Sequence, residues 1–350
     1  MKATFKKYLL NFKNPSGTSR GILRTKETWF VILEDDGKFG IGECGLFRGL
    51  SVDDVPEYEK KCIWVSEHIA LGENLLLKEL INFPSIQFGL EQAFLSLRSQ
   101  HPFELFESSF LRENRPININ GLVWMGSMEF MLNQIEEKLK NGFSCIKMKI
   151  GAIDFEAEIE ILKSIRNRYS KDEIELRVDA NGAFSPTEAF NKLEILSKLD
   201  LHSIEQPIKP SQVKEMYELC RNTPLPIALD EELIGVVDVA KKRQLIQIIQ
   251  PQYIILKPSL VGGISGSQEW IDIAEINRVG WWVTSALESN IGLNAIAQWT
   301  ATLSNIKPQG LGTGSLFSNN FECPLEVKNG GLFYNSAKEW KSNLINDLCI

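Results

Sequence analysis

The chain has 350 residues, of which 43% are hydrophobic and 24% are charged, and its formal net charge is -7 at neutral pH. This length suits two structural units better than one core, and the composition is that of a soluble globular protein. The acidic balance argues against nucleic acid as a partner, because phosphates attract a basic surface. The apolar runs are far shorter than the roughly 20 residues of a membrane span, so we expect no membrane insertion.

The six cysteines show neither a CxxC pair nor a regular spacing. Neither a zinc site nor a disulfide framework is therefore indicated, and reduced thiols are the simplest interpretation. The first residues lack the apolar core and cleavage site of a signal peptide. Together these observations predict a cytoplasmic protein. They leave the oligomeric state open, including assembly into a homo-oligomer.

The N-terminal third predicts strands followed by helices. Residues 22–42 are rich in β-branched and aromatic side chains around the turn residues Asp36 and Gly37, as expected for two strands. Residues 53–100 carry apolar side chains such as Ile86, Leu90 and Phe94 at helical spacing. Strands and helices that do not alternate are typical of an α+β domain.

From about residue 116, short apolar strands alternate with amphipathic helices. We expect strands at 143–150, 174–179, 203–205, 227–230, 254–257, 282–285 and 309–312. We expect helices at 155–169, after Asp154, and at 186–199, after the capping residue Ser185.

A polar residue ends most of these strands, and the steps between successive strand ends are regular. From Lys149 the steps to Asp179, Glu205, Asp230, Lys257 and Ser285 are 30, 26, 25, 27 and 28 residues. One strand, one helix and two loops have this length, and repeated βα units close into a barrel. An open doubly wound sheet is the alternative. Such a sheet is expected to carry a glycine-rich phosphate-binding turn after an early strand, and no GxGxxG occurs.

Three acids end consecutive strands of the expected barrel, where barrel enzymes build their sites. The carboxylates of Asp179, Glu205 and Asp230 should therefore converge. Three anions in a small volume need compensation, and a hard divalent cation with oxygen ligands provides it. The sequence thus predicts a site for Mg²⁺, with Mn²⁺ as the alternative.

Two lysines flank the predicted metal site and complete a site for proton transfer. An ammonium that is partly desolvated near a divalent cation can have its pKa lowered towards neutrality. We therefore predict Lys149 and Lys257 as the catalytic pair, each facing one side of a bound carbon acid. The two-residue period of a strand places Lys147 beside Lys149, and Arg177 and Asn181 on the face that carries the metal ligands.

Simpler interpretations exist for single residues. A lone aspartate at a strand end often only caps a helix, Glu231 could form only a salt bridge, and Lys147 could be a solvated lysine. His202 should face away from the site and have a structural role. A barrel kept as a binding protein would need a broken site. None of the five motif residues is replaced, so chance placement at five successive strand ends is the weaker explanation.

These residues resemble those of a known family, the muconate-lactonizing subgroup of the enolase superfamily. The matching residues are Lys147-Met148-Lys149, Asp179-Ala180-Asn181, Glu205-Gln206-Pro207, Asp230-Glu231 and Lys257, with further runs at 40–46, 49–51, 176–181, 284–292 and 310–314. The superfamily uses lysine or histidine bases beside Mg²⁺. The resemblance implies an enolase-like α/β fold. It consists of an α+β capping domain at residues 1–115, completed by about 321–350, over a modified (β/α) TIM barrel at 116–320.

The resemblance also implies a lyase that acts on a small anionic carboxylate. The expected reaction is a syn dehydration of 2-succinyl-6-hydroxy-2,4-cyclohexadiene-1-carboxylate in menaquinone biosynthesis, with Lys149 as the base and Lys257 as a fixed positive charge. The residues implied to bind substrate are Lys147, Arg177, Asn181, Ser285, Glu288, Gly312 and Thr313. Two segments rich in small residues, 43–51 and 16–20, are expected to close over the barrel mouth.

Racemases and epimerases of the same superfamily are the alternatives, because two opposed lysines can serve as two bases. Dipeptide epimerases carry an Asp-x-Asp on the last strand to hold the substrate ammonium, whereas this chain has Gly312-Thr313-Gly314. That difference weakens dipeptide epimerisation. Racemisation of N-succinylamino acids stays open, because its succinyl group resembles that of the other substrate, and muconate cycloisomerisation is a weaker third option.

Overall fold

The computed structural model describes residues 1–18, 21–151, 153–341 and 343–349. Its N-terminal part is a three-stranded antiparallel sheet of β1 (Lys2–Thr18), β2 (Gly21–Asp35) and β3 (Lys38–Cys44), in that order. Asp36 and Gly37 have φ values of 47° and 75°, as a two-residue hairpin turn requires, so the predicted turn is confirmed. The sequence analysis missed β1, because its many lysines and asparagines mask the strand pattern on this sheet edge.

Helices within the stretch predicted to be helical, residues 53–100, cover one face of this sheet. They are α1 (Tyr58–Glu67), α2 (Glu73–Glu79) and α3 (Pro84–Arg98). The helix α3 lies so close to β3 that a Cβ at Gly42 would come within 1.9 Å of the Gly89 carbonyl oxygen. On the other face, Phe30 and Ile32 pack with Leu344 of α13 (Leu344–Cys349) from the C-terminal tail. Part of the tail therefore shares a core with the N-terminal sheet.

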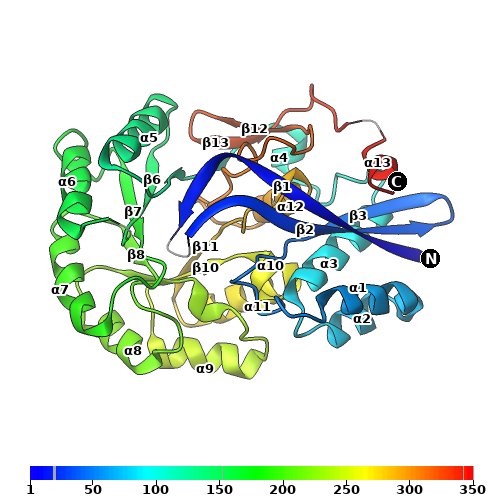
Figure 1. Cartoon of the computed structure of the whole chain (residues 1–350), viewed down its shortest axis with the longest axis horizontal. Helices are drawn as coiled ribbons and strands as arrows, with labels where there is room; N and C mark the ends of the chain where they lie inside the picture. The colour runs from blue at the N-terminus through cyan, green and yellow to red at the C-terminus, as the bar shows by residue number, and fades with distance from the viewer. Residues whose placement is uncertain (19–20, 152, 342, 350) are drawn as a thin grey trace.

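The second part of the molecule is a curled parallel sheet surrounded by helices (Figure 1). Its strands are β5 (Gly121–Val123), β6 (Cys145–Lys149), β7 (Glu175–Asp179), β8 (Ser203–Glu205), β9 (Ile227–Leu229), β10 (Tyr253–Leu256) and β11 (Gly280–Val283), and they are neighbours in chain order. The helices are α5 (Met128–Lys140), α6 (Phe155–Arg166), α7 (Pro186–Ser197), α8 (Val213–Asn222), α9 (Val239–Ile249), α10 (Pro258–Val261), α11 (Gly263–Ile276) and α12 (Asn290–Thr302). Strands alternate with helices, as the sequence spacing predicted.

A short segment joins the two edges of this sheet. The N–H and C=O of Gln309 bond to Asn118 and Asn120 at 2.8 and 2.9 Å, and those of Gly310 bond to Val283 and Ser285 at 2.8 and 3.1 Å. The strand predicted at 309–312 is thus reduced to two paired residues, which are enough to close the barrel. Nearby, β12 (Leu325–Lys328) and β13 (Gly331–Tyr334) form a small sheet with β4 (Ile117–Asn118).

The two predicted helix starts differ in how they are capped. The side chain of Asp154 accepts hydrogen bonds from the N–H groups of Glu156 and Ala157 at the start of α6, as a capping residue does. Ser185 also precedes its helix, but its hydroxyl bonds to the carboxylate of Glu188 at 2.6 Å and not to a backbone N–H. The capping hydrogen bond predicted for Ser185 is therefore wrong.

Two buried glutamates join the N-terminal part to the barrel. Glu43 on β3 accepts hydrogen bonds from the N–H groups of Ser289 and Gly292, both at 2.9 Å, at the start of α12. Glu91 on α3 accepts hydrogen bonds from the N–H groups of Ile264 and Ser265, at 2.5 and 3.0 Å, at the start of α11. The first N–H groups of a helix lack partners within the helix, and they form its positive end. Each acid therefore completes a barrel helix from outside the barrel.

The described residues contain no helix whose length and apolar character would let it cross a membrane.

Candidate active site

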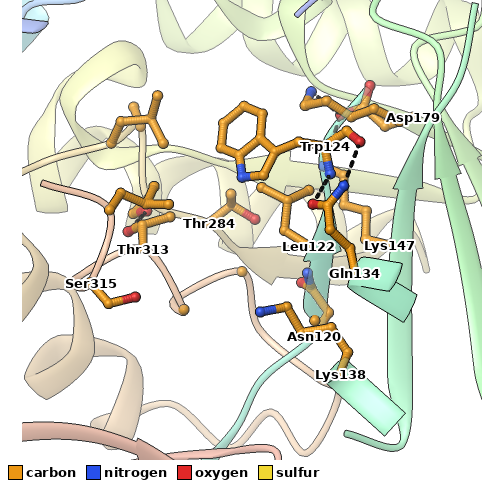
Figure 2. Close-up of a pocket in the computed structure, with 18 of the residues that line it drawn as sticks. Asn120, Leu122, Trp124, Gln134, Lys138, Lys147, Asp179, Thr284, Thr313 and Ser315 are labelled. Carbon is orange, nitrogen blue, oxygen red and sulfur yellow. Dashed lines mark hydrogen bonds and ion pairs between the residues drawn. The ribbon is translucent and has the colours of Figure 1, made fainter. Parts of the chain in front are cut away.

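The side chains predicted for catalysis and metal binding meet at the C-terminal ends of the barrel strands. The parallel register pairs Lys149 with Asp179, and Asp179 with Glu205, on three neighbouring strands. Asp230 and Lys257 directly follow β9 and β10. The alternating apolar side chains of these strands, such as Ile146 and Val178, belong to the hydrophobic core, so the strand period turns the polar set inwards. Figure 2 shows Lys147 and Asp179 on the same side of a cavity.

The three lysines form ion pairs with the three acids. The ammonium of Lys149 lies 2.9 Å from Asp179 Oδ2 and 2.7 Å from Asn181 Oδ1. Lys147 lies 3.0 Å from the same Asp179 oxygen and is also paired with Glu205. On the opposite side, Lys257 is paired with Asp230 and lies 4.0 Å from Glu205 Oε1. Lys149 and Lys257 therefore approach the acids from different sides.

Burial and mutual charge set the protonation of this cluster. Burial, reinforced by Asp179 and Asp230, raises the pKa of Glu205 to about 8. Burial opposes ionisation of Asp179 as well, but the three lysines outweigh it and hold the pKa of Asp179 well below its usual range. The acids in turn raise the pKa of Lys147 and of Lys257, although burial opposes the charge of each ammonium. A cation that took over the carboxylates would weaken this hold on the lysines.

The three carboxylates offer the donor atoms of a magnesium site, although the ammonium groups of three lysines are paired with them in this structure. Among the described residues, no group of three acidic, histidine or cysteine side chains is close enough together to hold a metal ion as it stands. The donors are nevertheless all carboxylate oxygens, which suit a hard cation. The oxygen Glu205 Oε1 is buried and finds no hydrogen-bond partner among the described residues. The set therefore fits Mg²⁺ if the ammonium groups withdraw from the carboxylates.

A cavity of about 360 Å³ extends from this cluster. Of the predicted substrate contacts, it is lined by Lys147, Asn181, Ser285, Gly312 and Thr313. The hydroxyls of Ser285 and Thr313 lie 2.6 Å apart, so one of them donates to the other. These residues form a wall that can donate hydrogen bonds to a substrate oxygen.

Two predicted substrate contacts lie away from the cavity. Arg177 sits one layer deeper in the barrel, where it donates to Glu175 at 2.6 Å and stacks on the ring of Trp282. Glu288 is buried behind the cavity wall and accepts hydrogen bonds from the Ser259 hydroxyl at 2.6 Å and from a backbone N–H at 2.7 Å. Neither side chain is among those that line the cavity. The structure thus does not bring Arg177 and Glu288 together with the other predicted site residues.

The structure shows the surroundings of Glu231 and His202, two residues whose roles the sequence left open. The carboxylate of Glu231 accepts a hydrogen bond from Asn181 Nδ2 at 3.0 Å, so Glu231 is connected to the lysine cluster through Asn181. His202 stacks on Tyr253 with ring centroids 4.8 Å apart. Burial lowers the pKa of His202 to about 4, which keeps its ring neutral at neutral pH. This environment fits the structural role expected for His202.

The N-terminal part also lines the cavity, through side chains that the sequence motifs do not identify one by one. Lys13, Phe47 and Leu50 line the cavity from above the barrel mouth. Phe47 and Leu50 belong to the expected closing segment 43–51, whereas Ser19 and Arg20 of the other segment lie outside the described residues. Closure itself stays a prediction. Trp124 and Gln134 were missed as well, because the strand before Trp124 has only three residues and gives a weak sequence signal.

Comparisons with known proteins agree with this geometry. The family model described as "Enolase C-terminal domain-like" matches residues 131–336. The o-succinylbenzoate synthase of Desulfotalea psychrophila is 44% identical, over 94% of this chain and 98% of that protein. The crystal structure of MenC from Desulfotalea psychrophila is similar, with a TM-score of 0.85 and 41% identity, and the match covers 95% of this chain and 99% of that one. These similarities confirm the predicted fold class, a modified barrel with a capping part.

The rival activity is represented by a more distant relative. The L-Ala-D/L-Glu epimerase of Bacillus subtilis is 29% identical, over 61% of this chain and 57% of that protein. Its substrate-bound structure has a TM-score of 0.81 at 21% identity. A likeness at that identity shows a shared fold alone.

Proposed function

The chain belongs to the enolase superfamily, and on this premise we propose that it acts as an o-succinylbenzoate synthase. It would remove water from 2-succinyl-6-hydroxy-2,4-cyclohexadiene-1-carboxylate and release 2-succinylbenzoate, a step of menaquinone biosynthesis. The observation that carries the proposal is the pair Lys149 and Lys257, which approach the buried acid cluster from different sides. The 44% identity to an enzyme of that name, over nearly both whole chains, supports the choice of reaction.

The residues of this chain divide the work of a syn dehydration. Asp179, Glu205 and Asp230 would hold Mg²⁺, which when bound stabilises the negative charge that develops on the substrate carboxylate. Lys149, in its unprotonated form, takes the proton alpha to the ring carboxylate. The electron pair of the broken C–H bond forms the new double bond of the ring. Hydroxide departs from the same face, and the proton held by Lys149 passes to it to give water.

Lys257 would act by its charge and not as a second base. It reaches the site from the side of Asp230, away from Lys149 and Asn181. A fixed ammonium there stabilises the substrate dianion without taking part in proton transfer. The hydroxyls of Ser285 and Thr313 line the same cavity, where they can donate to the oxygens of the succinyl arm.

The charge of the site favours an anionic substrate. In their ionised forms, the acid cluster with Glu231 has one more negative group than the three lysines have positive groups. While Lys149 still holds its proton, a divalent cation changes this to an excess of one positive charge, which one substrate carboxylate balances. Buried charges without a partner are costly, so the loaded site should prefer a carboxylate beside the metal.

Racemisation of N-succinylamino acids is the second candidate, because the same opposed lysines could act as two bases. The hydroxyl pair of Ser285 and Thr313 would suit its succinyl group equally well. Dipeptide epimerisation is less well supported, since the wall at residues 312–314 carries no acid to hold a substrate ammonium.

Direct assay tests the proposal. Wild-type protein with Mg²⁺ is expected to dehydrate the cyclohexadiene substrate and to lose this activity in chelator. The same protein is tested against a panel of N-succinylamino acids, with exchange of the alpha proton followed in deuterated water. Fast exchange of the amino acids, with the cyclohexadiene left unchanged, would establish racemisation as the function.

A further inference from the structure

One residue that lines the cavity lies where the barrel sheet ends. Trp124 directly follows β5, and β5 is the edge strand of the seven-stranded sheet. The closing segment pairs with Asn118 and Asn120, before β5, so it does not continue the ladder alongside Trp124. Beyond Trp124, Met125 forms a bridge to Gly17 of the N-terminal hairpin. Trp124 is therefore located between the barrel mouth and the part that covers it.

The side chain of Gln134 replaces the missing strand neighbour. Gln134 lies on α5, and its Oε1 accepts a hydrogen bond from the backbone N–H of Trp124 at 2.9 Å. Its Nε2 donates to the backbone C=O of Trp124 at 3.0 Å. A carboxamide that bonds to both the backbone N–H and the backbone C=O of one residue takes the place of a partner strand. These two hydrogen bonds fix the backbone of Trp124, from which the indole projects.

The indole forms a wall of the cavity. Figure 2 shows the ring of Trp124 projecting from the end of β5 into the space between Leu122 and the wall that carries Thr284 and Thr313. Leu122, Trp124 and Thr313 all line the cavity, as does Lys149 of the reaction site. Since the strand period places Leu122 on the same face as Lys147, the substrate body next to the lysines must lie along this wall.

We propose that Trp124 is a specificity-determining residue for the proposed reaction and that Gln134 is its positioning residue. The inference rests on the proposed function. An indole held at this place gives a flat apolar surface, which suits the planar diene part of the substrate ring. It also limits the width of the cavity, so a compact cyclic dianion is accepted and an N-succinylamino acid with a bulky side chain is disfavoured.

The chemistry separates this role from catalysis. Neither the indole nor the carboxamide ionises at neutral pH, so neither can serve as an acid or a base. Their loss should therefore raise KM and leave kcat nearly unchanged, in contrast to loss of a lysine. Removal of packing against an aromatic wall is expected to raise KM by about tenfold.

A double-mutant cycle tests whether Gln134 acts through Trp124. The variants are Trp124→Ala, Gln134→Met and the double variant, with Asn133→Ala as a control at an exposed position of the same helix. We expect about a tenfold higher KM in Trp124→Ala, about a threefold higher KM in Gln134→Met, and no further rise in the double variant. Asn133→Ala should match wild type.

A second measurement concerns selectivity. Trp124→Ala should lower the Ki of N-succinylphenylalanine, measured as a competitive inhibitor of dehydration, relative to the Ki of N-succinylalanine, because the widened cavity accepts the larger side chain. An unchanged ratio would overturn the role in specificity. KM effects of Gln134→Met and Trp124→Ala that multiply in the double variant would overturn the positioning role.

The outcomes also separate this inference from the function on which it rests. Failure of wild-type protein to dehydrate the cyclohexadiene would overturn the proposed function. Normal dehydration by wild type, together with an unchanged KM in Trp124→Ala, would overturn the inference alone.

Discussion

Two groups of buried carboxylates in this molecule are satisfied in different ways. At the barrel mouth, Asp179 and Glu205 face the ammonium groups of lysines, and one oxygen of Glu205 has no hydrogen-bond partner among the described residues. At the junction with the N-terminal part, Glu43 and Glu91 accept hydrogen bonds from backbone N–H groups at the starts of two helices. The residue types are alike, but the partners are ammonium groups of lysine side chains in one place and uncharged N–H groups in the other.

These two kinds of partner suit a buried acid to different roles. Backbone N–H groups at a helix start cannot leave, so the junction acids are held in one arrangement and contribute to stability. The ammonium of a lysine is at the end of a flexible stem and can move aside for a metal ion or a substrate. We therefore expect changes at the mouth to affect activity, and changes at the junction to affect folding.

The largest expected effect is loss of a metal ligand. Glu205→Gln keeps the size of the side chain but removes the charge, so it should lower kcat/KM by about 1000-fold or more and weaken Mg²⁺ binding. Because Glu205 lies among other acids, thermal stability without metal should not fall. Isothermal titration with Mg²⁺ and a melting curve check both parts. Wild-type activity in this variant, or in chelator, would contradict the magnesium site.

The next largest effects are those of the two lysine substitutions, which should differ from each other. Lys149→Arg keeps a cation but removes the base, and it should lower the rates of dehydration and of alpha-proton exchange by about 100- to 10,000-fold. Lys257→Arg should also lose turnover, yet it should keep slow exchange because Lys149 remains. Incubation with substrate in deuterated water, followed at the alpha position, measures both. The reverse pattern would make Lys257 the base.

At the junction, the expected effect is on stability. Glu43→Ala leaves the N–H groups of Ser289 and Gly292 and the hydroxyl of Ser289 without their acceptor in a buried place. Lost acceptors of this kind should cost about 4 kcal/mol of the free energy of unfolding. Urea unfolding measures the loss, and Mg²⁺ titration of the folded variant should give the wild-type affinity. Weakened Mg²⁺ binding without a loss of stability would remove the contrast between the two groups.

The smallest effect concerns pH. Burial raises the pKa of Glu91 to about 7, although three hydrogen bonds from the start of α11 oppose the shift. The folded protein thus holds this proton more tightly than the unfolded chain. The contribution of Glu91 to the free energy of unfolding should fall by up to about 3 kcal/mol as the pH rises from about 4.5 to about 7, and then level off. Urea unfolding across this range should show that slope in wild type and its absence in Glu91→Gln.

The sequence predicts the centre of the candidate site better than its surroundings. Regular spacing and parallel pairing are enough to align Lys149, Asp179 and Glu205, because the ends of parallel strands meet at one edge. The strand period gives the face on which Arg177 lies but not its depth, and a shift of two residues is one whole layer. Glu288 follows a strand end, where no period applies.

The remaining features depend on contacts between segments far apart in the chain. No local pattern indicates that Glu43 would cap α12, or that Gln134 would pair with the end of a three-residue strand. The strand β1 was missed because an edge strand with many lysines lacks a clear apolar alternation. These choices are made by tertiary packing, which overrides local preference.

The capping of barrel helices by Glu43 and Glu91 limits the order in which the chain can fold during synthesis. Glu43 and Ser289 are 246 residues apart, and Glu91 and Ile264 are 173 apart. During synthesis, both acids leave the ribosome long before the backbone amides that receive them. Contacts of such long range form late and slow folding. The caps on α11 and α12 should therefore form only after nearly the entire barrel has been translated, although the N-terminal part has a hydrophobic core of its own.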